Sequence, residues 1–191
     1  MYRFLKIICW PFCWLLFPAK RVNKKKYLDK KKNYILLCNH TSSLDAVVIM
    51  HHIHRTLRVV AKKELFRKKC NAWFLRTMHV IPIDRQKMDL TAVKTCISSL
   101  KEGKTLLIFP EGTRNKTGED LQEIKNGSAM FSIKTGVEIL PIRIQKRPKL
   151  FRFNTITFGE PFSLSQFEGQ RLTKDVLDEA SKIITEKLEN L

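Results

Sequence analysis

The chain has 191 residues, 43% of them hydrophobic, so it is long and apolar enough for one folded domain and is not a disordered tail. Its 36 lysines and arginines against 18 acidic residues give a formal net charge of +18, which favours polyanionic partners: nucleic acid, anionic lipid head groups or phosphorylated substrates. Five cysteines without a C-x-x-C pair argue against a zinc or dithiol site and indicate free thiols in a reducing compartment.

The first apolar segment, residues 4–17, reads FLKIICWPFCWLLF and precedes two groups of three lysines between Lys24 and Lys32. It is shorter than the roughly 20 residues of a membrane-spanning helix, and Pro11 interrupts it. A signal peptide is one alternative, but no small-residue cleavage site follows. We expect residues 1–32 to form an interfacial or re-entrant membrane anchor with a basic run whose lysines attract anionic phosphates. A buried N-terminal helix is the other alternative.

Beyond residue 32, short apolar runs alternate with longer amphipathic ones, which indicates an α/β fold with a mixed sheet flanked by helices. No repeat, low-complexity tract or linker divides the chain, so we expect residues 33–191 to form one domain. The predicted strands are 34–38, 57–61, 80–83, 105–109, 138–144 and 154–158, and the predicted helices are 44–54, 64–77, 89–101, 125–134 and 173–188.

The first group of candidate catalytic residues follows the strand 34–38 in the sequence NHTSSLD. Ligands commonly bind at the carboxyl ends of strands in open α/β sheets. If His40 lies in the turn and Asp45 in the first turn of a helix, the carboxylate can bind one imidazole nitrogen while the other accepts a proton from an alcohol. The alternative is that Asp45 or Ser42 caps the helix and His40 is an ordinary loop histidine. This pair alone does not decide between them.

The second group, FPEGTR, directly follows the apolar strand 105–109. Arg114 can bind a phosphate with two N–H groups, and Gly112 lets the backbone approach a ligand closely. Glu111 can accept a hydrogen bond from a hydroxyl or hold a basic neighbour. The alternative is a surface turn with a local Glu–Arg pair.

The third group is IPIDR, where Arg85 follows the strand 80–83. Asp84 and Arg85 could form a solvated ion pair, but three polar strand ends could also converge on one edge of a sheet. The sequence has no G-x-S-x-G nucleophile and no metal-ligand spacing. The histidines of the MHHIH run at 50–54 are assigned to packing or solvent, because no carboxylates or cysteines accompany them. We therefore expect no metal.

These segments together resemble the glycerolipid acyltransferase family, which includes bacterial 1-acylglycerol-3-phosphate acyltransferases. The NHTSSLD segment matches the H-x-x-x-x-D motif of that family through His40 and Asp45, and FPEGTR matches its phosphate-binding block in full. The match continues, in the family's order, with AKKELF at 61–66, IPIDR at 81–85 and ILPIRI at 139–144. The resemblance implies a glycerol-3-phosphate acyltransferase-like fold.

The resemblance also implies an enzyme that transfers an acyl group to 1-acyl-sn-glycerol-3-phosphate and produces phosphatidic acid in phospholipid biosynthesis. His40 would deprotonate the acceptor hydroxyl, Asp45 would orient His40, and the alkoxide would attack an acyl thioester directly. No cofactor is implied, and the acyl donor would be acyl-CoA or acyl carrier protein. The residues that would hold the glycerol phosphate are Arg85, Glu111, Gly112, Thr113, Arg114 and Lys125.

The sequence leaves some alternatives open. Another lysophospholipid or a lyso-aminolipid would also present a hydroxyl beside an anionic group. A nucleic-acid-binding module would suit the positive charge, but the aromatic residues concentrate near the N-terminus and do not alternate with basic residues in a recognition motif, so we expect no nucleic acid. A non-catalytic lipid-binding protein would not need both His40 and Asp45.

We expect a peripheral or monotopic protein on the cytoplasmic side of the cell membrane, in contact with its anionic surface. One departure from the family pattern is His79, which stands where many relatives carry glycine ahead of an apolar strand.

Overall fold

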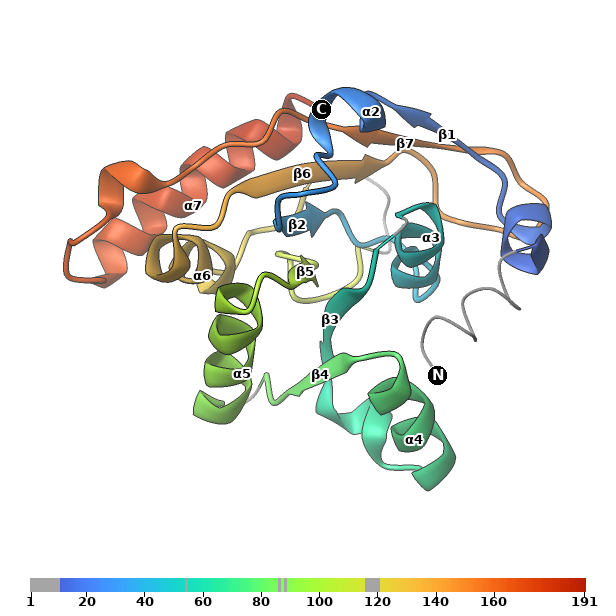
Figure 1. The fold of residues 1–191 in the computed structure, drawn as a ribbon, viewed down its shortest axis with the longest axis horizontal. Coiled ribbons are helices and arrows are strands. Elements are labelled where there is room, and N and C mark those ends of the chain that lie inside the picture. The colour runs from blue at the N-terminus through green and yellow to red at the C-terminus, as the bar shows by residue number, and fades with distance from the viewer. Residues whose placement is uncertain (1–10, 54, 86, 88, 116–120) are drawn as a thin grey trace.

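The computed structural model describes residues 11–53, 55–85, 87, 89–115 and 121–191. Within this part of the chain seven strands form one sheet: β1 (Ala19–Val22), β2 (Ile35–Cys38), β3 (Leu57–Lys62), β4 (Val80–Ile83), β5 (Thr105–Ile108), β6 (Ile139–Ile144) and β7 (Asn154–Phe158). Their order is β1-β7-β6-β2-β5-β3-β4, and only β6 and β7 are antiparallel neighbours (Figure 1). The mixed α/β sheet expected from the sequence is confirmed.

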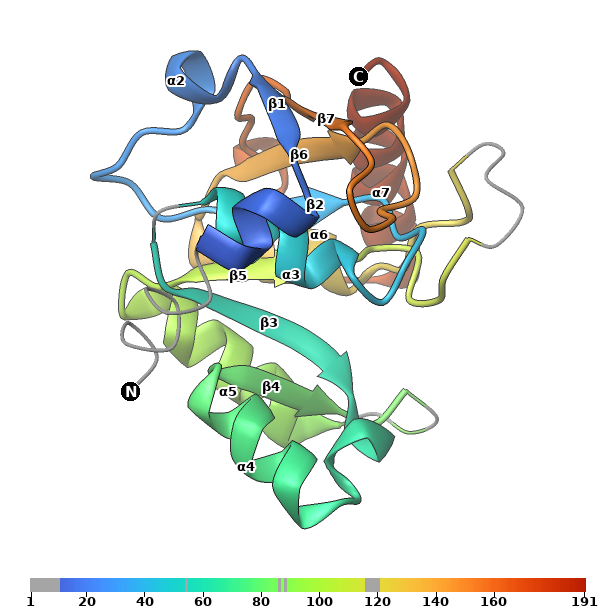
Figure 2. The same ribbon diagram turned by 90° about the vertical axis from the view of Figure 1, so that its right-hand side faces the viewer.

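Helices cover both faces of the sheet (Figures 1 and 2). Residues 11–16 are helical and lie with α3 over one face, whereas α5, α6 and α7 cover the other. The helices are α2 (Lys24–Tyr27), α3 (Asp45–His52), α4 (Lys69–Thr77), α5 (Leu90–Lys101), α6 (Gly127–Thr135) and α7 (Lys174–Glu189), with short 3-10 turns η1 (Lys63–Phe66) and η2 (Ser165–Phe167).

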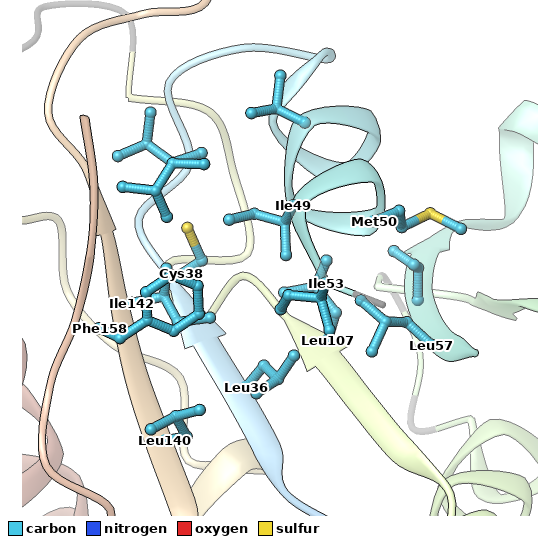
Figure 3. Packing of buried hydrophobic residues seen from close by; sticks show 14 of the residues in the cluster. Leu36, Cys38, Ile49, Met50, Ile53, Leu57, Leu107, Leu140, Ile142 and Phe158 are labelled. Carbon is cyan, nitrogen blue, oxygen red and sulfur yellow. The ribbon is translucent and has the colours of Figure 1, made fainter. Parts of the chain in front are cut away.

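The two faces of the sheet carry two apolar clusters, and β2 contributes to both. Leu36 packs with the cluster beneath α3, where Figure 3 shows it near Leu107 and Leu140, whereas Leu37 packs with the cluster beneath α5, α6 and α7. Both leucines are fully buried. A strand buried on both faces reads as a continuous apolar run, which is why the short sequence ILLC predicts it.

The strand β1 was not predicted, because its sequence AKRV shows no apolar alternation. It is an edge strand, and its place is set by parallel pairing with β7, in which Ala19 lies opposite Asn154. It lies within the segment 1–32 that the sequence analysis assigned to an anchor. Residues 1–10 of that predicted anchor lie outside the described residues. Across the residues that the structure does describe, none of the helices combines the length and apolarity needed to cross a bilayer.

The predicted helix 64–77 is divided in the structure. Lys68 has extended backbone angles (φ −83°, ψ 129°) and separates η1 from α4. After α4, His79 adopts a left-handed conformation with φ 58°, which glycine adopts without steric cost. The turn into β4 therefore keeps a glycine-like backbone although a histidine occupies it.

Candidate active site

The candidate residues come together at the carboxyl edge of the sheet. The chain leaves β2 into the loop 39–44 that precedes α3, and leaves the neighbouring β5 into the turn 109–115. The N–H of Asn115 donates to the carbonyl of His40 at 2.7 Å and joins the two loops. The order of the parallel strands thus brings together two motifs that lie about seventy residues apart.

His40 and Asp45 form a direct pair. The Nδ1 atom of His40 lies 2.9 Å from Oδ2 of Asp45, and the Asp45 side chain is fully buried whereas His40 is 14% exposed. The N–H groups of Thr41 and Ser42 also donate to Asp45 Oδ2, at 2.6 and 2.7 Å. Asp45 therefore binds the loop before α3, and the N-cap residue Leu44 makes no side-chain cap bond. Asp45 thus does not act as a helix cap, whereas the Ser42 hydroxyl accepts the N–H of Leu44 at 3.3 Å, just before the helix.

The ring of His40 is fixed on a second side by Phe109. The two rings are stacked with centroids 4.1 Å apart and an interplanar angle of 22°. Because a carboxylate accepts hydrogen bonds only, its contact with Nδ1 favours the tautomer that carries its hydrogen on Nδ1, and in this tautomer Nε2 has the lone pair. Such a ring can accept a proton from an alcohol, and the carboxylate stabilises the resulting imidazolium. Sequence reasoning missed Phe109 as a partner of the histidine, because their stacking depends on the pairing of β2 with β5.

Glu111 is buried and turned toward His40. Its Oε1 accepts the backbone N–H of His40 at 2.8 Å, whereas Oε2 is buried without a well-aligned hydrogen-bond partner among the described residues. Burial raises the pKa of this carboxyl, against the opposing effect of the His40 and Gln122 amides. No ion pair joins Glu111 to Arg114 in the described structure, so the local Glu–Arg turn expected as an alternative is not seen.

Two arginines from different strand ends lie at the same edge. Arg114 Nη1 donates to the hydroxyl of Ser43 at 2.7 Å, and Arg85 Nη1 donates to the carbonyl of Gly112. Burial lowers the pKa of the Arg85 guanidinium, against the charge of Glu64, which raises it. The guanidinium stays protonated at neutral pH, because an arginine pKa lies far above that range. The site therefore carries two cations beside the histidine.

Gly112 and Lys125 are in close contact. Gly112 has φ 71°, and a Cβ atom at this position would lie 2.7 Å from Cε of Lys125. The backbone N–H of Lys125 donates to the carbonyl of Pro110 at 2.9 Å, so the lysine is held against the turn. Glycine suits the left-handed backbone here, and a larger residue would displace the end of the Lys125 side chain.

An apolar pocket of about 430 Å³ opens beside these groups. His40, Arg85 and Arg114 form part of its wall. The other predicted phosphate-site residues do not line it: Glu111, Gly112, Thr113 and Lys125. The Thr113 hydroxyl donates to Gln122 at 3.0 Å. The remaining wall is mainly apolar and includes Val47, Met50, Val59, Phe74, Leu75 and Met78. Sequence reasoning did not foresee this pocket, because apolar residues that line a cavity have the same periodicity as residues that fill a core.

A protein-family model described as acyltransferase matches residues 20–145, which is more than half of the chain. The chain belongs to the acyltransferase family. The resemblance drawn from the sequence motifs is thereby confirmed, as is the expectation of an enzyme.

Several curated relatives of this acyltransferase are similar over most of their length. The 1-acyl-sn-glycerol-3-phosphate acyltransferase of Borreliella burgdorferi is 30% identical, covering 93% of this chain and 75% of the relative. The protein of the same name from Bacillus subtilis is 29% identical, covering 90% of each chain. The crystal structure of the 1-acyl-sn-glycerophosphate acyltransferase PlsC from Thermotoga maritima has a TM-score of 0.68 at 24% identity, covering 94% of this chain and 74% of that one. This last similarity supports the fold.

Proposed function

We propose that this acyltransferase transfers an acyl group from an acyl thioester to the free hydroxyl of 1-acyl-sn-glycerol-3-phosphate and so forms phosphatidic acid. The observation that carries the proposal is His40, paired with the buried Asp45, in the wall of a pocket that combines cationic and apolar surface. The acceptor has matching parts: a hydroxyl, a phosphate and an acyl chain. The names of the relatives from B. burgdorferi and B. subtilis agree with this acceptor.

In the proposed reaction, His40 Nε2 takes the proton from the acceptor hydroxyl as its oxygen attacks the thioester carbonyl. Asp45, held by the amides of Thr41 and Ser42, stabilises the imidazolium that forms. The tetrahedral intermediate then collapses, the carbon–sulfur bond breaks, and the proton on His40 passes to the departing thiolate. The acyl group moves to the acceptor in one displacement, without an acyl-enzyme.

The phosphate of the acceptor is assigned to Arg85 and Arg114, which reach the pocket from the ends of β4 and β5. A guanidinium can bind two oxygens of a phosphate in one plane, which gives both attraction and orientation. Gly112, with Thr113 and Lys125 around it, would form the remaining part of the phosphate site, and Glu111 would fix the loop of His40. These assignments follow the positions that the FPEGTR block has in the family.

The apolar part of the pocket suits an acyl chain. Each methylene removed from water contributes about 0.8 kcal/mol, so a long chain gains substantial affinity from such a wall. The donor would be acyl-CoA or acyl carrier protein, and no cofactor takes part in the proposed reaction. We place the enzyme at the cytoplasmic side of the cell membrane as a peripheral or monotopic protein, because its proposed acceptor is a lipid and its net charge is +18.

The deciding experiment is an assay of the purified protein with lysophosphatidic acid and each acyl donor, in which the product is followed by mass. Phosphatidic acid is the expected product. Turnover of another lysophospholipid or a lyso-aminolipid, without turnover of lysophosphatidic acid with either donor, would keep the chemistry and overturn the acceptor.

A further inference from the structure

Two segments far apart in the sequence present large apolar side chains to solvent side by side. One is the helical stretch of residues 11–16, and the other is the β6–β7 loop, residues 145–153. The N–H of Phe151 donates to the carbonyl of Leu16 at 2.8 Å, and both views show the loop beside the helix (Figures 1 and 2). The exposed apolar side chains of the two segments, each more than half exposed, are Phe12, Trp14, Leu15, Leu150, Phe151 and Phe153.

The β6–β7 loop alternates these apolar residues with cations. Its sequence, QKRPKLFRF, contains four basic and no acidic residues, and all four basic side chains are exposed: Lys146, Arg147, Lys149 and Arg152. Exposed apolar groups that are surrounded by basic groups are typical of surfaces that enter the head-group region of an anionic bilayer. The sequence analysis did not single out this loop, because it has neither the length nor the periodicity of a membrane helix.

The exposed aromatic tip is maintained in a strained conformation. Phe151 has φ 58°, a left-handed conformation that is unfavourable for a residue other than glycine, and its side chain is 68% exposed. The loop base is closed by Asn154, whose side chain donates to the carbonyl of Lys146 at 2.5 Å and accepts its N–H at 3.1 Å. Core packing does not explain an exposed aromatic side chain in a left-handed conformation, so its outward direction points to a function.

The loop leaves the sheet beside the catalytic histidine. The side chain of Asn39 forms two hydrogen bonds with the backbone of Ile144, the last residue before the loop, at 2.8 and 3.0 Å. Asn39 directly precedes His40. The apolar and basic surface therefore lies on the same edge of the sheet as the site.

The lysines that follow the N-terminal apolar segment lie at the opposite edge. The guanidinium of Arg55 donates to the carbonyls of Asp29, Lys30 and Lys32, and Lys32 pairs with Glu138 just before β6. These lysines lie in the loop of residues 28–34, which we call the lysine-rich loop and which leads into the amino end of β2. A membrane in contact with the His40 edge would not contact these lysines.

We propose that the β6–β7 loop, with residues 11–16 beside it, docks the enzyme on an anionic lipid bilayer and holds the His40 edge of the sheet against the lipid. An acidic carrier protein would match the four cations but would leave Leu150, Phe151 and Phe153 without an apolar partner. An anionic bilayer offers phosphates to the cations and an apolar interior to these three side chains. Docking in this orientation brings a lipid acceptor to the mouth of the site. The inference rests on the proposed function only where it names a lipid acceptor. Binding to vesicles is measured without turnover and does not depend on that function.

The first test compares two equal losses of charge in the full chain. Lys149→Gln/Arg152→Gln removes two cations from the loop, and Lys30→Gln/Lys31→Gln removes two at the opposite edge. Each basic residue near an anionic surface contributes about fivefold to binding. Sedimentation with phosphatidylglycerol–phosphatidylcholine vesicles should show about tenfold or greater weakening for the loop variant at low salt, and near-wild-type binding for the other. The reverse result would overturn the proposal and assign docking to the lysine-rich loop.

The second test changes the apolar tip. Phe151→Asn removes the aromatic group and places at φ 58° a residue that tolerates this conformation. Its melting temperature should not fall, whereas vesicle binding should weaken several-fold at both low and high salt, and Phe151→Leu should keep most of the binding. Wild-type binding by Phe151→Asn would overturn insertion of the tip.

Activity distinguishes this inference from the proposed function. The loop variants that weaken vesicle binding, Lys149→Gln/Arg152→Gln and Phe151→Asn, should keep wild-type turnover of a short-chain, water-soluble lysophosphatidic acid. Their turnover of the acceptor embedded in vesicles should fall by about the same factor as their vesicle binding. If vesicle binding is unchanged and turnover falls only with acyl carrier protein as donor, the loop docks an acidic protein and the lipid proposal is wrong. Absence of turnover in the wild type with every acceptor would count against the proposed function, whereas the binding results would still stand.

Discussion

At the scale of single residues, Asp45 contacts both the backbone of the loop before α3 and the side chain of the proposed general base, His40. One of its oxygens lies within hydrogen-bond distance of three nitrogen atoms, those of His40, Thr41 and Ser42, in a fully buried position. These contacts fix the position of the Asp45 side chain beside the imidazole. In the proposed mechanism this carboxylate stabilises the imidazolium that forms during proton transfer.

We predict that His40→Ala lowers kcat by about a hundred- to ten-thousand-fold, because the general base is lost. Asp45→Asn should also lower kcat strongly, since an amide does not stabilise an imidazolium. Steady-state kinetics and thermal unfolding should be measured together. The His40 variant should unfold near the wild-type temperature, and a folded His40 variant with normal turnover would contradict the mechanism.

Gly112 permits a prediction that separates backbone strain from crowding. Gly112→Ala and Gly103→Ala both place a side chain at positive φ, so each should lose about 1–2 kcal/mol of stability. A Cβ at position 103 meets nothing within 4 Å, whereas one at 112 would overlap Lys125. Only Gly112→Ala should therefore lower kcat/KM for the acceptor, as measured against the Gly103 variant. Equal activities of the two variants would show that the contact with Lys125 is unimportant.

At the scale of elements, α3 has three roles. Its first residue is Asp45, Val47 and Met50 line the apolar pocket, and Ile49 and Ile53, the residue after its end, pack on the sheet (Figure 3). Because this short helix contains Asp45, residues of the pocket wall and residues of the core, a change in how it packs on the sheet should alter the geometry of the site. One of its two buried histidines, His52, provides a way to perturb the helix with pH.

We predict that acid destabilises the protein through His52. Burial lowers the pKa of His52 from 6.5 to about 4, helped by the charges of His51, Arg21 and Lys24 and opposed by the carbonyl of Phe17. Between these values the unfolded chain binds a proton that the native state does not, so stability falls as the pH decreases from 6.5 toward 4. The loss is on the order of 2 kcal/mol after solvent screening.

Urea unfolding of the wild type and His52→Gln between pH 7 and pH 4.5 measures this contribution. A glutamine can still donate to the Phe17 carbonyl but does not titrate, so its stability should depend less on pH. Parallel pH profiles for the two proteins would contradict the assignment.

At the scale of the whole molecule, one sheet joins two apolar clusters. Leu36 and Leu37 are neighbours in β2, are both fully buried and belong to clusters on opposite faces. Because both clusters pack against the same central strand, unfolding of one face should expose the other. The domain should therefore unfold as one cooperative unit.

We predict that Leu36→Ala and Leu37→Ala each lower the free energy of unfolding by about 2–5 kcal/mol, the usual cost of a cavity in a packed core. Circular dichroism and tryptophan fluorescence should report coincident transitions for both variants. Leu150→Ala, in an exposed position, is the control and should change stability by about 0.5 kcal/mol or less. Two separate transitions would show that the faces fold independently.

The sequence by itself determined the α/β class, the strands β2 to β7, and the segments that carry His40, Asp45, Arg85 and the FPEGTR block. Apolar runs and helical periodicity are local properties that depend on neighbours in the chain, so they can be read without a fold. The motifs are local as well, which is why the family resemblance identified the enzyme class. The roles of the individual site residues stay predictions, which the variants above test.

Only the tertiary structure decided how the segments meet. It paired the edge strand β1 with β7, stacked Phe109 on His40, and formed the apolar pocket between α3, α4 and β3. It also placed the lysine-rich loop after α2 and the β6–β7 loop at opposite edges of the sheet, a separation that composition does not reveal. Each of these features joins residues distant in sequence, and such contacts depend on strand order and packing rather than on local propensity.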